Sequence, residues 1–300
     1  MNIQQLETFC WICRLGTFSA AAERMFTSPA SVSSRIRELE QELDVILFDR
    51  IGRQVQVTLK GRELLVHAEK IFIEASQIRL TAGKPSITSG GVKIGMGEAI
   101  AAHSLLAVVN ALKARYPGLA VEFDIDLNAS LLQKLARGAI DLAVVGGPVT
   151  DAEIRVAPIG AMNVVWVGAP ALLGDLHDAV PADLAALPVI SLNREALLYA
   201  QMQAWFAQGE AIPRSISFCN SLSTMLYVAR GGVCVCMMPQ QLIQADVDAG
   251  TLRILRSTPA VPPIDFCVVT RADSLDPAIA DFAVIVSDVC SLLPCDEDIW

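Results

Sequence analysis

The residues of this 300-residue chain that are best suited to chemistry form a short run near the N-terminus. Ser28 and Pro29 together signal the start of a helix, because a serine side chain accepts an orphan backbone N–H and a proline at the first helical position loses no hydrogen bond. The predicted helix presents hydroxyls and two guanidinium groups on its outward face, from Ser28, Ser31, Ser33, Ser34, Arg35 and Arg37. Such donors suit phosphate oxygens and base edges, so the run predicts a helix that enters the major groove of DNA.

The residues before this run predict the elements that would hold it in place. Leu6, Phe9, Cys10 and Cys13 follow the spacing of one helix face, and Gly16-Thr17 ends that helix. We expect Ser19 to cap a second, short helix. Residues 18–37 then form a helix-turn-helix, the motif whose second helix reads the major groove.

A two-stranded ribbon is predicted after the reading helix. Two apolar segments, 45–48 and 55–57, flank Arg50 and Arg53. We expect these arginines to contact the DNA backbone or the minor groove as the tip of a wing. The alternative is a small helical dimerisation domain whose arginines are merely solvated, and the net charge of only +1 over residues 1–90 favours that alternative slightly.

A longer helix follows from residue 58 onward, with a stripe of apolar and small residues at alternating spacings of four and three. This spacing is typical of a coiled-coil seam. A second copy of the helix would cover the stripe, so the pattern predicts a dimer; the alternative is a helix packed on its own domain. The seam residues are Leu64, Ala68, Ile71, Ala75 and Ile78.

Composition describes a globular chain with a large core, at 53% hydrophobic and 18% charged residues. The total charge of −9 is unevenly spread, since residues 91–300 carry −10 and would repel nucleic acid by themselves. The apolar runs are too short for a membrane-spanning helix, and the start of the chain lacks the pattern of an export signal. We therefore expect a cytoplasmic protein without a membrane partner.

Strand and helix patterns alternate after the breaker-rich segment 83–91. This alternation predicts an α/β architecture with a largely parallel sheet, and a second region of the same kind begins after Met162.

Catalytic and cofactor motifs do not stand out in this sequence. Gly95-Met96-Gly97 lacks the third glycine of a dinucleotide-binding loop, so we expect no cofactor. The eight cysteines and three histidines do not form paired metal-ligand spacings, so we expect no metal and read the cysteines as buried apolar residues. No catalytic residue is predicted.

Several short motifs follow one another in a fixed order along nearly the whole chain. They are Leu6-Glu7-Thr8-Phe9, Gly16-Thr17-Phe18-Ser19-Ala20-Ala21-Ala22-Glu23-Arg24, Ser28, Val32-Ser33, Ile36, Leu39-Glu40, Leu47-Phe48-Asp49-Arg50, Thr58-Leu59-Lys60-Gly61, Arg115-Tyr116-Pro117, the segment 135–143, and Ala229-Arg230-Gly231-Gly232-Val233 leading to Pro239. With these motifs the front part of the chain, through residue 80, resembles the amino-terminal domain of LysR-type transcriptional regulators without a gap. The back part resembles the family's effector domain more loosely.

This resemblance implies a multi-domain α+β protein. Its parts are a winged helix-turn-helix domain (1–60), a linker helix for dimerisation (61–82), a hinge (83–91) and a two-lobed effector-binding domain (92–300) like type 2 periplasmic binding proteins. Lobe I would comprise 92–161 and 267–300, and lobe II 162–266. The resemblance also implies a bacterial homo-oligomer, usually a tetramer, that binds a two-fold-related operator in double-stranded DNA, responds to a small-molecule effector and contacts RNA polymerase.

Two departures from the family pattern concern recognition. Pro29 and Ser34 stand where the family commonly has Gln and Arg, so we expect at least one operator position to be read differently. In the effector cleft, Glu98 replaces a Ser/Thr-rich helix start. Glu98 is either an ordinary helix-start residue or a cleft residue that disfavours carboxylate ligands. The predicted cleft residues are Glu98, Ala99, Ile100, Asn128, Ser130, Gly146, Asn193 and Ser221.

The sequence thus favours a ligand-responsive, sequence-specific DNA-binding regulator that acts as a homo-oligomer and is not an enzyme. The alternative is a two-lobed solute-binding module or an enzyme whose N-terminal part serves only for assembly.

Overall fold

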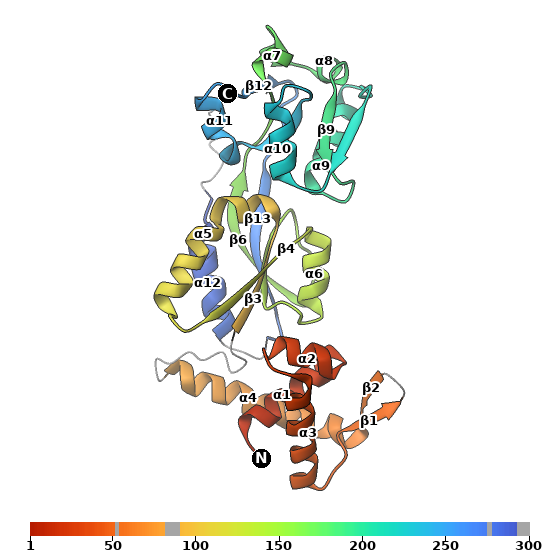
Figure 1. Ribbon diagram of the computed structural model, residues 1–300, viewed down its shortest axis with the longest axis vertical. Coiled ribbons are helices and arrows are strands. Elements are labelled where there is room, and N and C mark those ends of the chain that lie inside the picture. The colour runs from red at the N-terminus through yellow and green to blue at the C-terminus, as the bar shows by residue number, and fades with distance from the viewer. Residues whose placement is uncertain (52–53, 82–90, 275–277, 293–300) are drawn as a thin grey trace.

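The computed structural model describes residues 1–51, 54–81, 91–274 and 278–292. Its elements form three units along the long axis of the molecule (Figure 1). We call them the front unit (1–81), lobe I (91–162 and 264–292) and lobe II (163–257). The predicted hinge 83–91 lies outside the described residues apart from Gly91, where the first strand of lobe I begins.

The front unit begins with three helices that enclose a small apolar core. A capping box of Asn2 and Gln5 starts the first helix, and Gly16, with φ 74°, ends it in the left-handed conformation that glycine tolerates best. The core contains Phe9, Ile12 and Leu39, each almost fully buried. The helices are α1 (Ile3–Leu15), α2 (Phe18–Arg24) and α3 (Pro29–Leu43).

The helix starts agree with the sequence at one position and differ at another. Ser28 caps α3 by accepting a hydrogen bond from the Ser31 N–H, and Pro29 is the first helical residue, as predicted. The predicted cap Ser19 is wrong, because Thr17 caps α2: it has extended backbone angles and its hydroxyl accepts from the Ala20 N–H. Ser19 lies inside the helix, where its backbone is already helical.

The wing is an antiparallel pair of β1 (Phe48–Ile51) and β2 (Gln54–Val57). The first strand starts later than the predicted segment 45–48. The Glu40 carboxylate accepts from the backbone N–H groups of Leu47 and Phe48, at 2.8 and 3.3 Å, which ties this stretch to α3 before the ribbon begins. Arg50 pairs with Val55 in the ribbon, and Arg53 lies outside the described residues.

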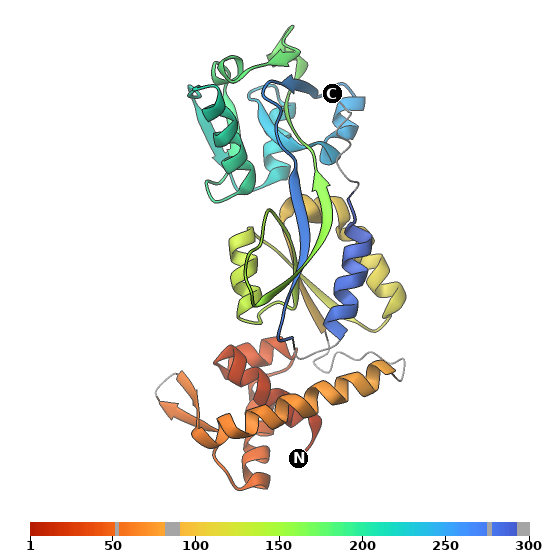
Figure 2. The same ribbon diagram turned by 180° about the vertical axis from the view of Figure 1, so that it is seen from behind.

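The linker helix α4 (Leu59–Thr81) lies across α1 (Figure 2). Phe72 and Ala68 are buried in the front-unit core, and Leu64 packs against it. Ala68 therefore packs within its own chain and is not available to a partner helix, which corrects its assignment to the dimer seam. Ile71 and Ile78 remain exposed, at 42% and 68%, with the half-buried Ala75 between them.

Lobe I is built on a five-stranded sheet in the order β4-β3-β5-β13-β6. Successive residues of β5 face opposite sides: Val144 packs with helices α5 and α12, whereas Val145 packs with α6 (Figure 1). The strands are β3 (Gly91–Met96), β4 (Ala120–Ile125), β5 (Leu142–Gly146), β6 (Ile154–Met162) and β13 (Ile264–Arg271), and the helices are α5 (Glu98–Arg115), α6 (Asn128–Ala136) and α12 (Ala278–Cys290).

Lobe II contains a four-stranded sheet, β11-β7-β12-β8, and a parallel pair of β9 and β10. Its core centres on Trp166, Trp205 and Phe206, whose rings lie about 5 Å apart. The strands are β7 (Val164–Gly168), β8 (Asp178–Ala179), β9 (Val189–Leu192), β10 (Ile216–Cys219), β11 (Cys236–Pro239) and β12 (Arg253–Ser257). The helices are α7 (Pro170–Leu173), α8 (Pro181–Ala185), α9 (Leu197–Gln208), α10 (Leu222–Arg230), η1 (Gln240–Leu242) and α11 (Gln244–Asp248).

Two long strands, β6 and β13, carry the chain between the lobes (Figure 2). Because one strand leaves lobe I and the other returns, β13 pairs antiparallel with both β5 and β6. In lobe II, β7 pairs antiparallel with β11 and β12. The expectation of a largely parallel sheet is therefore wrong for these strands and right for β3, β4 and β5. β13 starts at Ile264, before the predicted lobe boundary at residue 267.

Candidate functional site

The first candidate surface is α3, whose first turns carry the predicted DNA-reading residues. Ser28, Pro29 and Ser34 are exposed, whereas Ser31, Ser33 and Arg35 are half-buried. The Ser28 and Ser31 hydroxyls lie 2.9 Å apart. Arg37 is exposed one turn beyond Ser33. Polar groups at an accessible helix start can reach phosphates and base edges.

Three carboxylates on α3 are each engaged within the front unit. Glu38 accepts from the Ser34 hydroxyl at 2.9 Å and from the Gln5 amide at 3.1 Å. Glu40 accepts a hydrogen bond from the Leu47 N–H just before the wing, and Glu42 pairs with the ammonium group of Met1. The Met1 ammonium group offsets the charge of Glu42, whereas the neutral donors to Glu38 and Glu40 leave those charges in place. The contact with Glu38 also means that Ser34 already donates its hydroxyl proton to a protein partner.

The second candidate site is a cavity of about 790 Å³ between the lobes. Lobe I contributes the residues after β3, β4 and β5, and lobe II contributes the residues after β9 and β10. Ligand pockets of 300–1,000 Å³ are typical of small-molecule sites. The polar lining consists of Glu98, Asp126, Asn128, Asn193, Glu195 and Asn220.

Five of the eight predicted cleft residues line this cavity: Glu98, Ala99, Asn128, Gly146 and Asn193. Ile100 does not, because its side chain is fully buried in the core of lobe I. Ser130 donates to Asp126 at 2.5 Å instead, and Ser221 caps α10 beside the cavity. The prediction from the sequence did not include the apolar residues that line the cavity, among them Leu197, Leu198, Ile264 and Phe266. Only the return of β13 to lobe I brings Ile264 and Phe266 to this place.

Glu98 connects the two lobes. It is the first residue of α5 in lobe I, yet its carboxylate accepts from the Leu222 N–H at 2.8 Å and from the Ser221 hydroxyl at 3.2 Å in lobe II. Both interpretations of Glu98 from the sequence are partly correct, because it lies at the start of a helix and also lines the cleft. On the lobe I side of the cavity, the Asn128 amide donates a hydrogen bond to the Gly146 carbonyl at 2.5 Å.

A charged cluster lies at the lobe I edge of the cavity. The Lys134 ammonium group contacts Asp124 at 2.7 Å and Asp126 at 2.8 Å. Hydrogen bonds from Lys134, and then from Ser130, lower the pKa of Asp126 to about 2. Asp126 therefore contributes a negative charge to the cavity wall throughout the physiological pH range.

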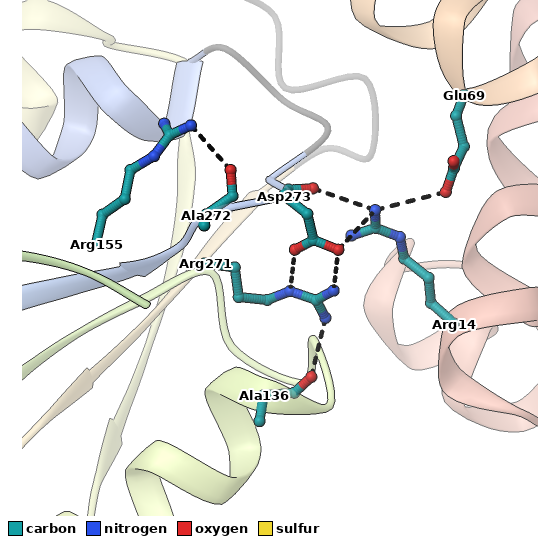
Figure 3. A network of polar contacts seen from close by, with 7 residues as sticks. All are labelled: Arg14, Glu69, Ala136, Arg155, Arg271, Ala272 and Asp273. Carbon is teal, nitrogen blue, oxygen red and sulfur yellow. Dashed lines mark hydrogen bonds and ion pairs between the residues drawn. The ribbon is translucent and has the colours of Figure 1, made fainter. Parts of the chain in front are cut away.

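A polar network joins the front unit to lobe I (Figure 3). Arg14 on α1 donates to the Asp273 carbonyl at 3.2 Å and lies 3.5 Å from Glu69 of α4. Arg271 donates to both carboxylate oxygens of Asp273, at 2.8 and 2.7 Å, and to the carbonyl of Ala136 at the end of α6.

A buried ion pair lies beside this network. Arg24 of α2 pairs with Asp141, the residue before β5, and their side chains are only 3% and 6% exposed. The Arg24 guanidinium also stacks on the Trp11 ring at 4.3 Å, and the Lys93 N–H donates to Asp141 at 2.8 Å. Burial raises the pKa of Asp141, and the Arg24 charge acts in the opposite direction.

Metal and thiol chemistry find little support in the residues that the structure describes. No group of three or more His, Cys, Asp or Glu side chains is arranged there to hold a metal ion. Burial raises the pKa of the Cys13 thiol to about 12 and those of Cys234 and Cys290 to about 11. Thiols with raised pKa values react slowly, because the thiolate is the nucleophile.

Two family models match the chain. Residues 3–62 match the bacterial regulatory helix-turn-helix protein of the lysR family, and residues 87–291 match the LysR substrate binding domain. The chain belongs to the LysR family of bacterial regulators. It is therefore a transcriptional regulator with a DNA-binding domain and an effector-binding domain, which confirms the predicted fold class and class of function.

One relative and two solved structures resemble this chain over most of its length, and the two structures share its fold. The SDS degradation transcriptional activation protein of a Pseudomonas species is 28% identical over 266 residues, covering 87% of this chain and 86% of that protein. A full-length OxyR variant from Pseudomonas aeruginosa superposes with a TM-score of 0.66 at 20% identity, over 97% and 95% of the two chains. Full-length CbnR, solved with its target DNA, has a TM-score of 0.54 at 19% identity, over 96% and 100%. No helix among the described residues is both long and apolar enough to cross a membrane.

Proposed function

We propose that this LysR-family regulator binds a two-fold-related operator with two copies of α3. The way it binds that DNA changes when a small molecule fills the cavity between its lobes. The observation that carries the proposal is the accessible helix α3, which Ser28 caps and which carries Ser31, Arg35 and Arg37 among its exposed or half-buried residues. Residues 1–60 would act as the DNA-binding domain and 92–300 as the effector-binding domain.

The exposed residues of α4 support a homodimer. Ile71 and Ile78 are one heptad apart on α4, on the exposed face next to Ala68 and Phe72, which pack in the front-unit core. An exposed apolar heptad pair is the usual seam between two parallel or antiparallel helices. Pairing through Ile71, Ala75 and Ile78 would place two α3 helices on one duplex, and pairing of such dimers would give a tetramer.

The roles on DNA differ among the residues. Ser31, Ser33 and Arg35 would meet base edges, and Arg37, Arg50 and Arg53 would contact phosphates. Pro29 has no side-chain donor or acceptor for a base, and the Ser34 hydroxyl already donates to Glu38, so we expect discrimination at these two positions to be weaker.

Titration of the protein's own upstream DNA with the full-length chain tests the proposal. We expect Arg37→Ala to weaken binding to all sequences and to reduce the salt slope by about one unit, since one phosphate contact is lost. Arg256→Ala is the matched control, because Arg256 is exposed on lobe II, far along the molecule from α3. Equal affinities and salt slopes for Arg37→Ala and wild type would contradict the phosphate role. A wild-type chain that fails to retain this DNA in low salt contradicts the proposed function.

We further propose that the protein works without enzymatic turnover and in the cytoplasm. The family assignment supports the first point, and the described residues that line the cavity include no serine, cysteine or histidine to form a nucleophile–histidine pair. DNA, its partner, lies in the cytoplasm of a bacterium.

A further inference from the structure

We infer that the cavity takes a ligand with an apolar body and a cationic head, and that Glu98 sets this preference because it fills the anion position of lobe II itself. The inference rests on the proposed function, since it names the chemical class of the effector for the same cavity.

The first step concerns the start of α10. The N-terminus of a helix attracts anions, because its first N–H groups lack partners and the helix dipole is positive there. In this protein the Glu98 carboxylate occupies that place: one oxygen accepts from Leu222 N–H at 2.8 Å and the other from the Ser221 hydroxyl at 3.2 Å. A carboxylate ligand would have to displace Glu98 to use these donors.

The second step concerns charge. Glu98, Asp126 and Glu195 line the cavity, and the described lining residues include no lysine, arginine or histidine. The nearby Lys134 is held between Asp124 and Asp126, so it is not free to serve an anionic ligand. A cleft lined by one sign of charge concentrates ligands of the opposite sign.

The third step concerns the ligand's body. Apolar side chains from both lobes line the same cavity, among them Leu127, Leu132, Leu197, Leu198, Ile264 and Phe266. A small polyamine would leave these surfaces without an apolar partner. The combination of an apolar wall and three carboxylates therefore fits an amine or guanidinium on a hydrophobic or aromatic skeleton.

A matched set of probes tests this class by calorimetry on the full-length protein. 2-Phenylethylamine, 2-phenylethanol and 3-phenylpropionate share a ring and a short chain but differ in the charge of the head. We expect wild type to bind the amine at least tenfold more tightly than the carboxylate. Glu98→Gln keeps the size of the side chain and removes its charge, and we expect it to lower this preference at least tenfold. Glu153→Gln removes an exposed charge elsewhere and should leave the preference unchanged.

A second measurement does not depend on the choice of probe. Glu98→Ala vacates the start of α10, so acetate should raise its melting temperature above that in sodium chloride of equal ionic strength. Wild type and Glu98→Gln should show no such difference, because their side chains still fill the position.

Three results would overturn the inference: carboxylate binding by wild type as tight as amine binding, no amine binding at all, or an acetate effect that is the same in all three proteins. DNA binding is measured in parallel with the same preparations. Intact DNA binding with any of these results refutes the ligand class alone, whereas loss of DNA binding by wild type refutes the proposed function.

Discussion

At the scale of single residues, the effector domain uses carboxylates in unlike ways. Glu98 reaches across the cleft to a helix start, Asp141 is buried against Arg24, and Asp126 lies at the cavity edge in contact with Lys134. The same side-chain chemistry thus serves lobe closure, docking of the front unit and the charge of the binding site. The environment of each carboxylate, and not its type, determines which of these it does.

The Asp126–Lys134 contact gives a pH-dependent stability. The pKa of Asp126 falls from 3.8 to about 2 in the folded protein, because Lys134 and Ser130 hydrogen-bond to its charged form. A lowered folded-state pKa stabilises the protein above the unfolded value, and this contribution is lost as the pH falls from about 4 to about 2. We expect Lys134→Met to cost about 0.5–1 kcal/mol at pH 7, since both side chains are one-third exposed.

Urea unfolding at a series of pH values measures this effect. The curve of unfolding free energy against pH should be flatter for Lys134→Met than for wild type between pH 4 and pH 2. Lys113→Met removes an exposed lysine at the far end of α5 and should leave the slope as it is. Parallel curves for wild type and Lys134→Met would show that the contact does not affect folding.

At the scale of elements, residue patterns specify what is local and miss what depends on distant chain segments. Ser28-Pro29 predicts the start of α3 because the cap and the first helical residue are adjacent. The apolar spacing predicts α4, but the sequence does not show that α1 covers Ala68. Likewise, Asn128 and Gly146 are recognisable at a helix start and a strand end, whereas Phe266 reaches the cavity only because β13 returns from lobe II.

The exposed stripe of α4 leads to a prediction about assembly. Ile71→Asp places a charge in the middle of the proposed seam, where a partner helix would have to bury it. We expect the dimer to dissociate and operator affinity to fall at least tenfold, because each protomer then contributes only one α3. Sedimentation velocity and DNA titration on the same samples measure both effects.

Val66→Asp provides the control for this variant. Val66 is 53% exposed on the same helix, close to the 42% of Ile71, but lies on a different face. Its substitution should change neither the sedimentation coefficient nor the operator affinity. If Ile71→Asp sediments like wild type, the α4 seam is wrong and another surface must join the protomers.

At the scale of the whole molecule, β5 and α6 extend from the cavity to the front unit. Gly146 at one end of β5 and Asn128 at one end of α6 line the cavity. Asp141 precedes the other end of β5 and binds Arg24, and Ala136 ends α6 where Arg271 holds its carbonyl (Figure 3). A displacement of either element at the cavity would thus reach the contacts that hold the DNA-binding helices.

The Arg24–Asp141 pair is the most buried ion pair among those contacts, and its loss tests how firmly the front unit is docked. Asp141→Asn retains an oxygen for the Lys93 N–H but removes the carboxylate charge that faces the buried Arg24 guanidinium. Removing one partner of a buried ion pair typically costs about 3–5 kcal/mol. We expect a loss of this size in urea unfolding, and faster amide hydrogen exchange in α2 and at the start of β3.

Asp178→Asn breaks an ion pair whose side chains are 73–74% exposed and should change stability by less than about 0.5 kcal/mol. The double variant Arg24→Met/Asp141→Leu removes both charges and should recover much of the loss. Equal effects of Asp141→Asn and Asp178→Asn would mean that the front unit is not anchored through this pair, and that a signal from the cavity must reach DNA by another route.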